Sequence, residues 1–210
     1  MTLLDERKRT VQAAYDTLGR RFGEWAEEIE GDPWDRFLEE LAVRLPAGSR
    51  LLDLGCGNGA KIARLTGSVE LVAVDLSEEQ LRLARATLPG STLVHGDFGA
   101  LDFATETFDA VTGFYSIMHV PRDEHRGLFE RIVGWLKPGG LFLASLSHVG
   151  GEDRTYEWLG VEMFFSGFDA ETNRRLVRDA GFELILDDLV WMQEPQGEVA
   201  FLWVLARKAS

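Results

Sequence analysis

The chain has 210 residues, of which 45% are hydrophobic, and its formal net charge is −13. This length suits one α/β domain with a sizeable core, so we expect a single domain over residues 1–210. No apolar run approaches the roughly 18 residues of a membrane helix, and charges occupy the segment where a signal peptide would be apolar, so the sequence predicts a cytoplasmic protein without membrane contact. The acidic balance disfavours a nucleic-acid partner, and the lone cysteine excludes an internal disulfide and a cysteine-based zinc site.

Residues 1–45 are predicted to form an N-terminal helical cap. Apolar residues such as Val11 and Leu18 recur at helical spacing. A second helix is expected with Asp32 as its cap and Pro33 at its first position, ending near Leu45 because a proline follows.

Short apolar runs then alternate with amphipathic segments. The predicted strands are 51–54, 71–74, 92–94, 110–114 and 141–145, and the predicted helices are 60–65, 78–88 and 125–136. Strands that alternate with helices indicate βαβ units, and the continuous apolar character of the strands is typical of a parallel sheet covered on both faces.

The C-terminal part follows a different pattern. A helix is expected over 169–180, followed by strands over 183–191 and 198–206. The six residues between these strands are too few for a parallel crossover, so the two strands must form an antiparallel hairpin. The predicted fold is α/β: a Rossmann-like, mostly parallel sheet with a C-terminal antiparallel hairpin, helices on both faces and the N-terminal helical cap.

The most informative segment is LLDLGCGNG at 51–59, a buried strand that runs into three glycines and an expected helix. A dinucleotide fingerprint is one residue longer between its second and third glycines. Asp53 places negative charge beside this loop, which disfavours a pyrophosphate and suits a cationic ligand. Asp75, at the end of the next strand, is a candidate for holding ribose hydroxyls. The alternatives are that Asp75 caps a helix beginning near Ser77 and that Asp53 satisfies only the loop.

Five motifs together resemble those of the class I S-adenosylmethionine-dependent methyltransferases, and the bacterial small-molecule branch above all. The motifs are LLDLGCGNG at 51–59, VAVDLSEEQL at 72–81, VHGDF at 94–98, FDAVTGFYSIMHV at 108–120 and LKPGGLFLAS at 136–145. The resemblance covers about residues 11–207. It implies that the protein binds S-adenosyl-L-methionine and transfers the methyl group to a small-molecule acceptor.

The resemblance also implies a cofactor site. Its expected members are Tyr15, Asp53, Gly55, Cys56, Gly57, Asp75, Leu76, Asp97, Phe98 and Phe114. In this reading Asp53 helps to hold the methionine amino group, Asp75 binds the ribose and Asp97 bonds the adenine amino group. Leu76 and Phe98 would lie against the adenine ring.

The methionine end of the cofactor would lie over Gly55 and Gly57, with Phe114 and Tyr115 near the methyl group. Tyr15 resembles a helix-borne tyrosine that closes over the cofactor. The family often has a second tyrosine seven residues later, where this chain has a phenylalanine. The alternative for these aromatic side chains is plain core packing.

For the acceptor side, the candidate catalytic residues are Tyr115, His119 and His148. The two histidines follow strands that are expected to end at the site, and imidazole can exchange a proton near neutral pH. His119 could instead cap a turn or pack. Residues 149–168 are rich in aromatic side chains and are expected to form a lid. The acceptor is therefore expected to be apolar or aromatic, or an amine attracted by acids of this lid.

Two other functions stay open. One is an NAD(P)-dependent oxidoreductase, although no tyrosine has a lysine at the Tyr-x-x-x-Lys offset. The other is a regulatory module that binds S-adenosylmethionine without catalysis. No metal is expected, and the protein would act as a monomer or a homodimer.

Overall fold

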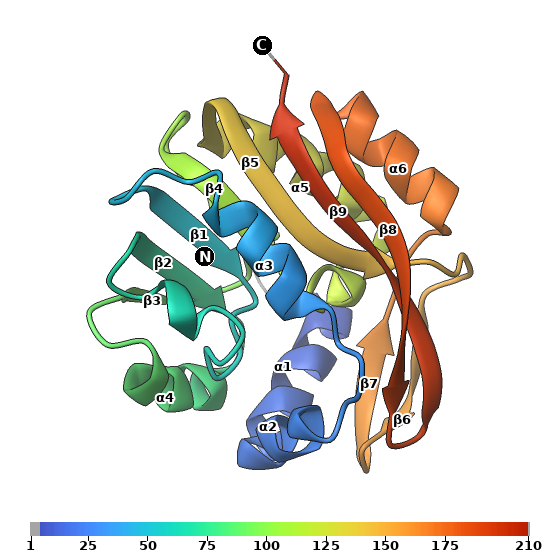
Figure 1. Ribbon diagram of the computed structural model, residues 1–210. Helices are drawn as coiled ribbons and strands as arrows, with labels where there is room; N and C mark the ends of the chain where they lie inside the picture. Colours follow the sequence, from blue (N-terminus) through green and yellow to red (C-terminus); the bar gives the residue numbers. More distant parts are fainter. Residues whose placement is uncertain (1–4, 210) are drawn as a thin grey trace.

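The computed structural model describes residues 5–209, so the first four residues of the predicted cap and the last residue of the predicted domain lie outside it. Seven strands form the main sheet (Figure 1). In spatial order they are β3 (Thr92–His95), β2 (Glu70–Asp75), β1 (Arg50–Leu54), β4 (Phe108–Gly113), β5 (Leu136–Ser147), β9 (Gly197–Lys208) and β8 (Phe182–Glu194).

The direction of the strands confirms the predicted mixed sheet. The pairs β1–β2, β1–β4, β2–β3 and β4–β5 are parallel. Strand β9 runs antiparallel to both of its neighbours, β5 and β8. The hairpin of β8 and β9 thus inserts one antiparallel strand beside β5, as its short turn requires.

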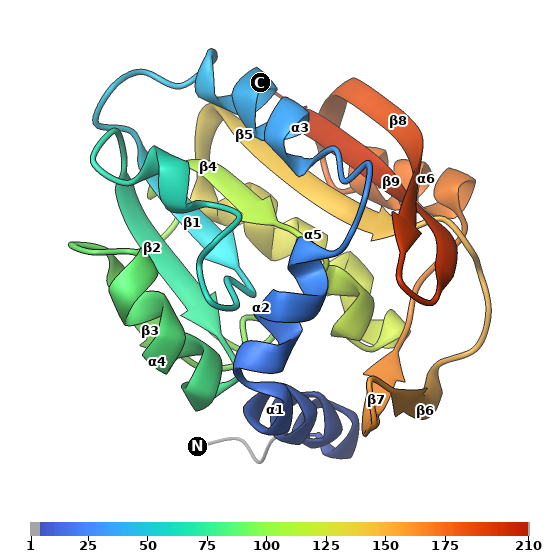
Figure 2. The same cartoon turned by 60° about the horizontal axis from the view of Figure 1, so that its bottom comes forward.

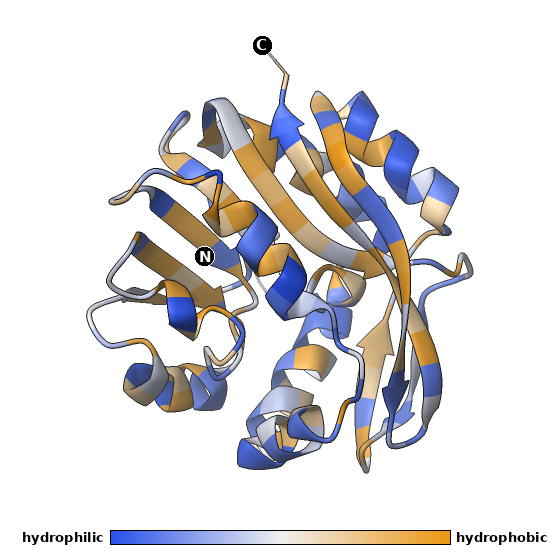
Figure 3. Cartoon of the chain, viewed as in Figure 1, coloured by the Kyte–Doolittle hydropathy of each residue, from blue (hydrophilic) through white to orange (hydrophobic). Residues whose placement is uncertain are grey.

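Helices cover both faces of the sheet because alternate side chains of each strand point to opposite faces. On one face, α3 (Trp34–Ala42) and α4 (Glu78–Thr87) pack against strand residues such as Leu51 and Trp203. On the other, α5 (Arg122–Trp135) and α6 (Ala170–Asp179) pack against residues such as Leu52 and Val204. Figure 3 shows the resulting band of hydrophobic strands in the middle of the molecule.

The N-terminal region holds three helices where two were predicted. Helices α1 (Glu6–Leu18) and α2 (Arg20–Glu27) meet at Gly19, whose φ of 51° ends the first helix. They lie across the carboxyl ends of the central strands (Figure 2). Helix α3 lies on a face of the sheet, where Phe37 stacks on Trp203 with ring centroids 4.9 Å apart. It begins at Trp34, one residue after the predicted Pro33, and its first free N–H donates to Asp32 Oδ1 at 3.1 Å.

The helix predicted over 60–65 is wrong. Turns follow the glycine loop, and only Ala63–Leu65 forms a short 3₁₀ helix, η1. Gly59 and Gly67 have φ values of 82° and bracket a segment too short to nucleate an α-helix. The Asn58 side chain also accepts the N–H of Ala60 at 3.0 Å, which favours a turn. The glycine loop therefore has no α-helix N-terminus behind it.

The predicted lid contains a separate two-stranded hairpin, β6 (Arg154–Trp158) and β7 (Val161–Phe165). Strand β7 packs on α1, and the apolar cluster between them includes Val11, Met163 and Phe164. A backbone hydrogen bond of 2.7 Å from Ser166 N to Met118 O joins the hairpin to the segment after β4. The helical cap and the hairpin thus form one structural unit over the end of the sheet.

Candidate active site

Two cavities lie side by side at the carboxyl ends of the central strands. The first, of about 380 Å³, lies between the glycine loop, the ends of β2 and β4, and helices α1 and α2. The second, of about 430 Å³, lies between this region, the β6–β7 hairpin and the turn of β8 and β9. Both are lined by Tyr15, Phe22, Ala26, Ile29, Lys61 and Tyr115. Strand order reverses between β1 and β4, and open α/β sheets bind ligands at such a point.

The glycine loop is held close to the strands on either side. The N–H groups of Gly55 and Cys56 both donate to the carbonyl of Val74, at 2.8 and 2.9 Å. Gly55 has a φ of 75°, and a Cβ atom there would overlap the side chain of Ser116. Only glycine satisfies both constraints at this position. The sharp turn exposes the loop backbone to the first cavity.

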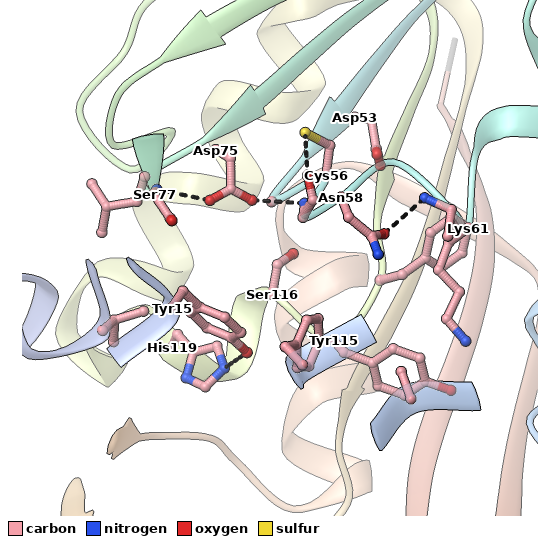
Figure 4. Close-up of a pocket in the computed structure, with 18 of the residues that line it drawn as sticks. Tyr15, Asp53, Cys56, Asn58, Lys61, Asp75, Ser77, Tyr115, Ser116 and His119 are labelled. Atoms are coloured by element: carbon pink, nitrogen blue, oxygen red, sulfur yellow. Dashed lines mark hydrogen bonds between the residues drawn. The ribbon is translucent and has the colours of Figure 1, made fainter. Parts of the chain in front are cut away.

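Asp75 organises the loop and does not cap the following helix. One carboxylate oxygen accepts the N–H of Gly57 at 2.7 Å, and the other accepts the N–H of Ser77 at 2.8 Å (Figure 4). The α4 cap is the Ser77 hydroxyl, which accepts the N–H of Gln80. Burial raises the pKa of Asp75 although these hydrogen bonds act to lower it. The side chain is 8% exposed and lines the first cavity.

Asp53 is a second buried carboxylate, 3% exposed, on the same cavity. The hydroxyl of Thr112 donates to its Oδ1 at 2.6 Å, and no described residue forms a hydrogen bond to Oδ2. Burial raises the pKa of Asp53 to about 7; the Thr112 hydrogen bond opposes this shift, and the charge of Asp75 adds to it. The site therefore has an acid that ionises near neutral pH and has a free oxygen.

Asp97 binds a lysine that sequence reasoning missed. Its carboxylate accepts from Lys8 Nζ and from Gly99 N, both at 2.7 Å. Lys8 is 6% exposed and also pairs with Glu124 at 2.5 Å. Burial acts to lower the pKa of Lys8, but the two carboxylates outweigh it and the net shift is upward. Helix α1 thus contributes a fixed positive charge at the adenine end of the predicted site.

The half-buried Tyr15 and the buried His119 form a hydrogen-bonded pair (Figure 4). The Tyr15 hydroxyl lies 3.0 Å from Nε2, and Nδ1 lies 2.8 Å from the carbonyl of Phe164. A carbonyl can only accept, so Nδ1 carries the proton and Nε2 accepts from the tyrosine. Burial lowers the pKa of His119 to about 4, which keeps the ring neutral at pH 7. His119 lines the first cavity and not the second, although it contacts Tyr15 and Phe165, which both line the second.

Tyr115 stands between the two cavities in a strained backbone conformation. Its φ is 54°, which is uncommon for a residue with a side chain. The hydroxyl donates to Asp32 Oδ1 at 2.6 Å, and Lys61 Nζ forms an ion pair with Asp32 Oδ2. Burial, followed by the charge of Asp32, raises the pKa of Tyr115. The erroneous helix over 60–65 hid Lys61, because it assigned that residue to an ordinary helical surface.

The remaining predicted site residues also reach the cavities. Those that line the first are Cys56, Gly57, Leu76, Phe98 and Phe114. Phe114 is only 7% exposed and packs on Trp203 with ring centroids 5.7 Å apart, so it also belongs to the core. His148 lines the second cavity and lies edge-on to Trp191 at 5.6 Å.

The lid acids that were expected to attract an amine are not part of either cavity lining. None of the lid acids, Glu152, Asp153, Glu157 and Glu162, lines the second cavity. Asp153 pairs instead with Arg7 at 3.1 Å. The carboxylates on this cavity are Glu194 and Glu198, from the turn of β8 and β9. They lie near the cavity because the β8–β9 hairpin reaches the N-terminal region, where Glu30 and Gln193 exchange two backbone hydrogen bonds of 2.9 Å.

The charges on the first cavity disfavour a dinucleotide. Its lining contains two lysines and five carboxylates, and each lysine is already paired with an acid. A pyrophosphate would meet uncompensated negative charge there. No group of three or more histidine, cysteine or acidic side chains within residues 5–209 is arranged to hold a metal ion.

The central part of the chain is similar to a known protein family. The family described as "Methyltransferase domain" matches residues 51–140, which run from β1 to the start of β5. The glycine loop, Asp75, Asp97 and Tyr115 all lie within the residues that match this family.

Relatives of the methyltransferase domain act on different small molecules. The chain is 40% identical over 134 residues to demethylmenaquinone methyltransferase of Clavibacter sepedonicus, covering 62% of this chain and 52% of the relative. It is 26% identical over 200 residues to sterol 24-C-methyltransferase of Saccharomyces cerevisiae, covering 78% and 49%. The chain thus spans about half the length of these curated relatives.

A solved structure shares the fold over the full chain. Burkholderia thailandensis 1,6-didemethyltoxoflavin-N1-methyltransferase, crystallised with 1,6-didemethyltoxoflavin and S-adenosylhomocysteine, superposes with a TM-score of 0.75 at 22% identity. The match covers 100% of this chain and 93% of that chain. The N-terminal helices and the β6–β7 hairpin are therefore included in the shared fold. Within residues 5–209, no helix has the length and apolar character to span a membrane.

Proposed function

We propose that this protein binds S-adenosyl-L-methionine in the first cavity and transfers its methyl group to a small molecule in the second. The observation that carries this proposal is the junction of the two cavities at Tyr15 and Tyr115. A donor and an acceptor held in adjacent cavities need no further movement to meet, which converts their reaction into an effectively intramolecular one.

The residues of the first cavity fit this cofactor. The free oxygen of Asp53 suits the ammonium group of the methionine part, and an ionised carboxylate there also favours a positively charged sulfur. Gly57 lines the cavity, and a Cβ atom there would meet no protein atom closer than 3.9 Å, so a side chain would occupy ligand space. Both Asp75 oxygens keep a lone pair beyond their backbone hydrogen bonds, and these can accept the ribose hydroxyls.

The adenine end would lie between Leu76 and Phe98, beside Asp97. Each Asp97 oxygen already accepts one hydrogen bond, from Lys8 or from Gly99, and retains capacity for the adenine amino group. The ion pair with Lys8 fixes the orientation of the Asp97 carboxylate. Lys8 is therefore proposed as a positioning residue for the adenine subsite.

S-adenosylmethionine carries its methyl group on a positively charged sulfur. When the methyl group is transferred, its bond to sulfur breaks and the sulfur becomes part of a neutral thioether. The protein aligns the acceptor's lone pair with that methyl group and excludes water. Tyr15, fixed by His119, and Tyr115, fixed by Asp32, would form the aromatic wall at the reacting atoms. Where the acceptor must lose a proton, His148 is the imidazole on the acceptor side.

We further propose that residues 5–27 and the β6–β7 hairpin act together as the cover of a single catalytic domain. The same proposal places the protein in the cytoplasm as a monomer or a homodimer. Its net charge of −13 and the carboxylates of both cavities favour a small acceptor over a nucleic acid.

The experiment that tests the proposed function has two stages. Calorimetry with S-adenosylhomocysteine measures cofactor binding, and NADH serves as the competing ligand. A screen of amines, phenols, carboxylates and thiols with S-adenosylmethionine then detects a mass gain of one methyl group. Failure to bind S-adenosylhomocysteine would refute the cofactor assignment. Binding without transfer to any acceptor class would favour a regulatory module.

A further inference from the structure

The second cavity is walled by aromatic rings from four separate segments. Trp25 of α2 meets Trp158 edge-on at 5.0 Å, and Trp158 meets Phe165 edge-on at 5.9 Å. Tyr156 stacks on Phe165 at 4.8 Å, and Trp191 of β8 also lines the cavity. These rings line a space of about 430 Å³.

The rim of this cavity leaves apolar surface open to solvent. Tyr156 is 49% exposed, Trp191 is 53% exposed and Val149 is 61% exposed. These are three of the five large hydrophobic side chains that are exposed among the described residues, and all three line the second cavity. Such a concentration marks a binding surface, because isolated exposed residues would be scattered.

One carboxylate lies within this aromatic setting without a cation. Glu194 is half-buried and lines the cavity, and its carboxylate forms no hydrogen bond or ion pair with residues 5–209. Tyr156 lines the same cavity, where burial and then the negative charge of Glu194 raise the pKa of its hydroxyl. The exposed Glu198 adds a second acid. The cavity's single described cation, Lys61, is already bound by Asp32.

We propose that the acceptor is a cationic small molecule with an aromatic or apolar body, whose positive charge lies beside Glu194 and against the surrounding rings. This proposal rests on the assignment of the second cavity to the acceptor. Ring faces attract cations, and a carboxylate strengthens that attraction. The positive group is a recognition element, and its position at the β8–β9 turn leaves the rest of the molecule to extend toward Tyr115.

The same arrangement disfavours other acceptors. A neutral acceptor would remove water from Glu194 and offer no charge in return, which is costly for a carboxylate. An anionic acceptor would add repulsion from Glu194 and Glu198. Selection between acceptors therefore follows the sign of their charge more than the shape of their apolar body.

The test uses three indoles that differ mainly in charge: tryptamine (cation), tryptophol (neutral) and indole-3-propionate (anion). Their dissociation constants are measured by calorimetry at pH 7.5 with S-adenosylhomocysteine present. We expect tryptamine to bind about tenfold more tightly than tryptophol, equivalent to about 1.4 kcal/mol, and indole-3-propionate to bind most weakly. In Glu194→Gln the advantage of tryptamine over tryptophol should fall to within twofold.

Glu183→Gln is the matched control, since Glu183 is an exposed acid at the other end of β8 and lines neither cavity. It should keep the full preference for tryptamine. Equal binding of tryptamine and tryptophol by the native protein, or no binding of any indole, would overturn the proposal without any variant. The proposal would also be overturned if Glu194→Gln bound S-adenosylhomocysteine normally and still preferred tryptamine over tryptophol. If the native protein did not bind S-adenosylhomocysteine, the proposed function itself would be refuted.

Discussion

Replacing Asp53 by asparagine tests the buried charge beneath the glycine loop. The carboxylate is 3% exposed, and burial raises its pKa from 3.8 to about 7. The folded chain therefore binds the Asp53 proton more tightly than the unfolded chain does. Between pH 3.8 and pH 7 the unfolded chain has lost this proton while the folded chain retains it, so the free energy of unfolding falls as pH rises.

The size of this effect follows from the pKa difference. At about 1.36 kcal/mol for each unit, the full loss above pH 7 is at most about 4 kcal/mol. Asparagine has a similar shape, can still accept the hydroxyl of Thr112, and does not ionise. Asp53→Asn should therefore be more stable than the native protein at pH 8, and this advantage should vanish near pH 4.

The same substitution should weaken cofactor binding. With a pKa of about 7, the ionised fraction of Asp53 rises roughly tenfold from pH 6 to pH 8, so the Kd for S-adenosylmethionine should fall about tenfold over this range. In Asp53→Asn the Kd should be higher and should lose this dependence on pH. Calorimetry gives the Kd, and urea denaturation at pH 4 and pH 8 gives the stability.

Asp188→Asn is the control, because Asp188 pairs with Arg36 at the surface and lines neither cavity. It should retain the native dependence of both quantities on pH. Two results would refute the reasoning: an Asp53→Asn variant less stable than the native protein at pH 8, or a native Kd that stays constant from pH 6 to pH 8.

Asp75→Ala should largely remove the stabilisation that S-adenosylmethionine gives, which for the native protein is about 2.7 kcal/mol at one hundred times the Kd. Thermal denaturation measures this, and retained stabilisation would count against the ribose assignment. Trp158→Ala should raise the KM for the acceptor and leave the Kd for S-adenosylmethionine unchanged; unaltered acceptor kinetics would contradict the lid assignment. Phe164→Ala should instead cost about 3–5 kcal/mol of stability in urea denaturation, since Phe164 is 2% exposed and packs against α1; a loss under 1 kcal/mol would show that the hairpin is not anchored there. Because the pKa of buried His119 falls from 6.5 to about 4, the native protein should lose up to about 3 kcal/mol as pH drops through that range. His119→Gln should abolish this loss in urea denaturation, and an unchanged pH slope would exclude His119 as its source.

The sequence by itself predicted the sheet and the side chains that line the first cavity. Short apolar runs such as 51–54 and 71–74 are typical of strands covered on both faces, and the two are found paired in parallel. Asp53 and Asp75 lie on those strands at the edge where the glycine loop begins. Their positions followed from local pattern, because strand ends of a parallel sheet meet at one edge.

The segment after the glycine loop shows where local pattern misled. Residues 60–65 favour a helix by composition, but the tertiary structure holds them in turns between Gly59 and Gly67. A Cβ atom at Gly59 would lie 2.6 Å from Leu88, so α4 packs directly on this turn. Contact with a distant element thus prevailed over the weak helical preference of a short segment.

Only the tertiary structure decided which charges meet. Lys8 reaches Asp97 across 89 residues of sequence, and Lys61 reaches Asp32 across 29. Glu194 lines the second cavity because β8 and β9 extend past the end of β5 toward the helical cap. Hydrophobic periodicity involves residues close together in the chain, so it can be read from the sequence. The partner of a buried charge depends instead on how distant segments pack, and a local pattern does not show it.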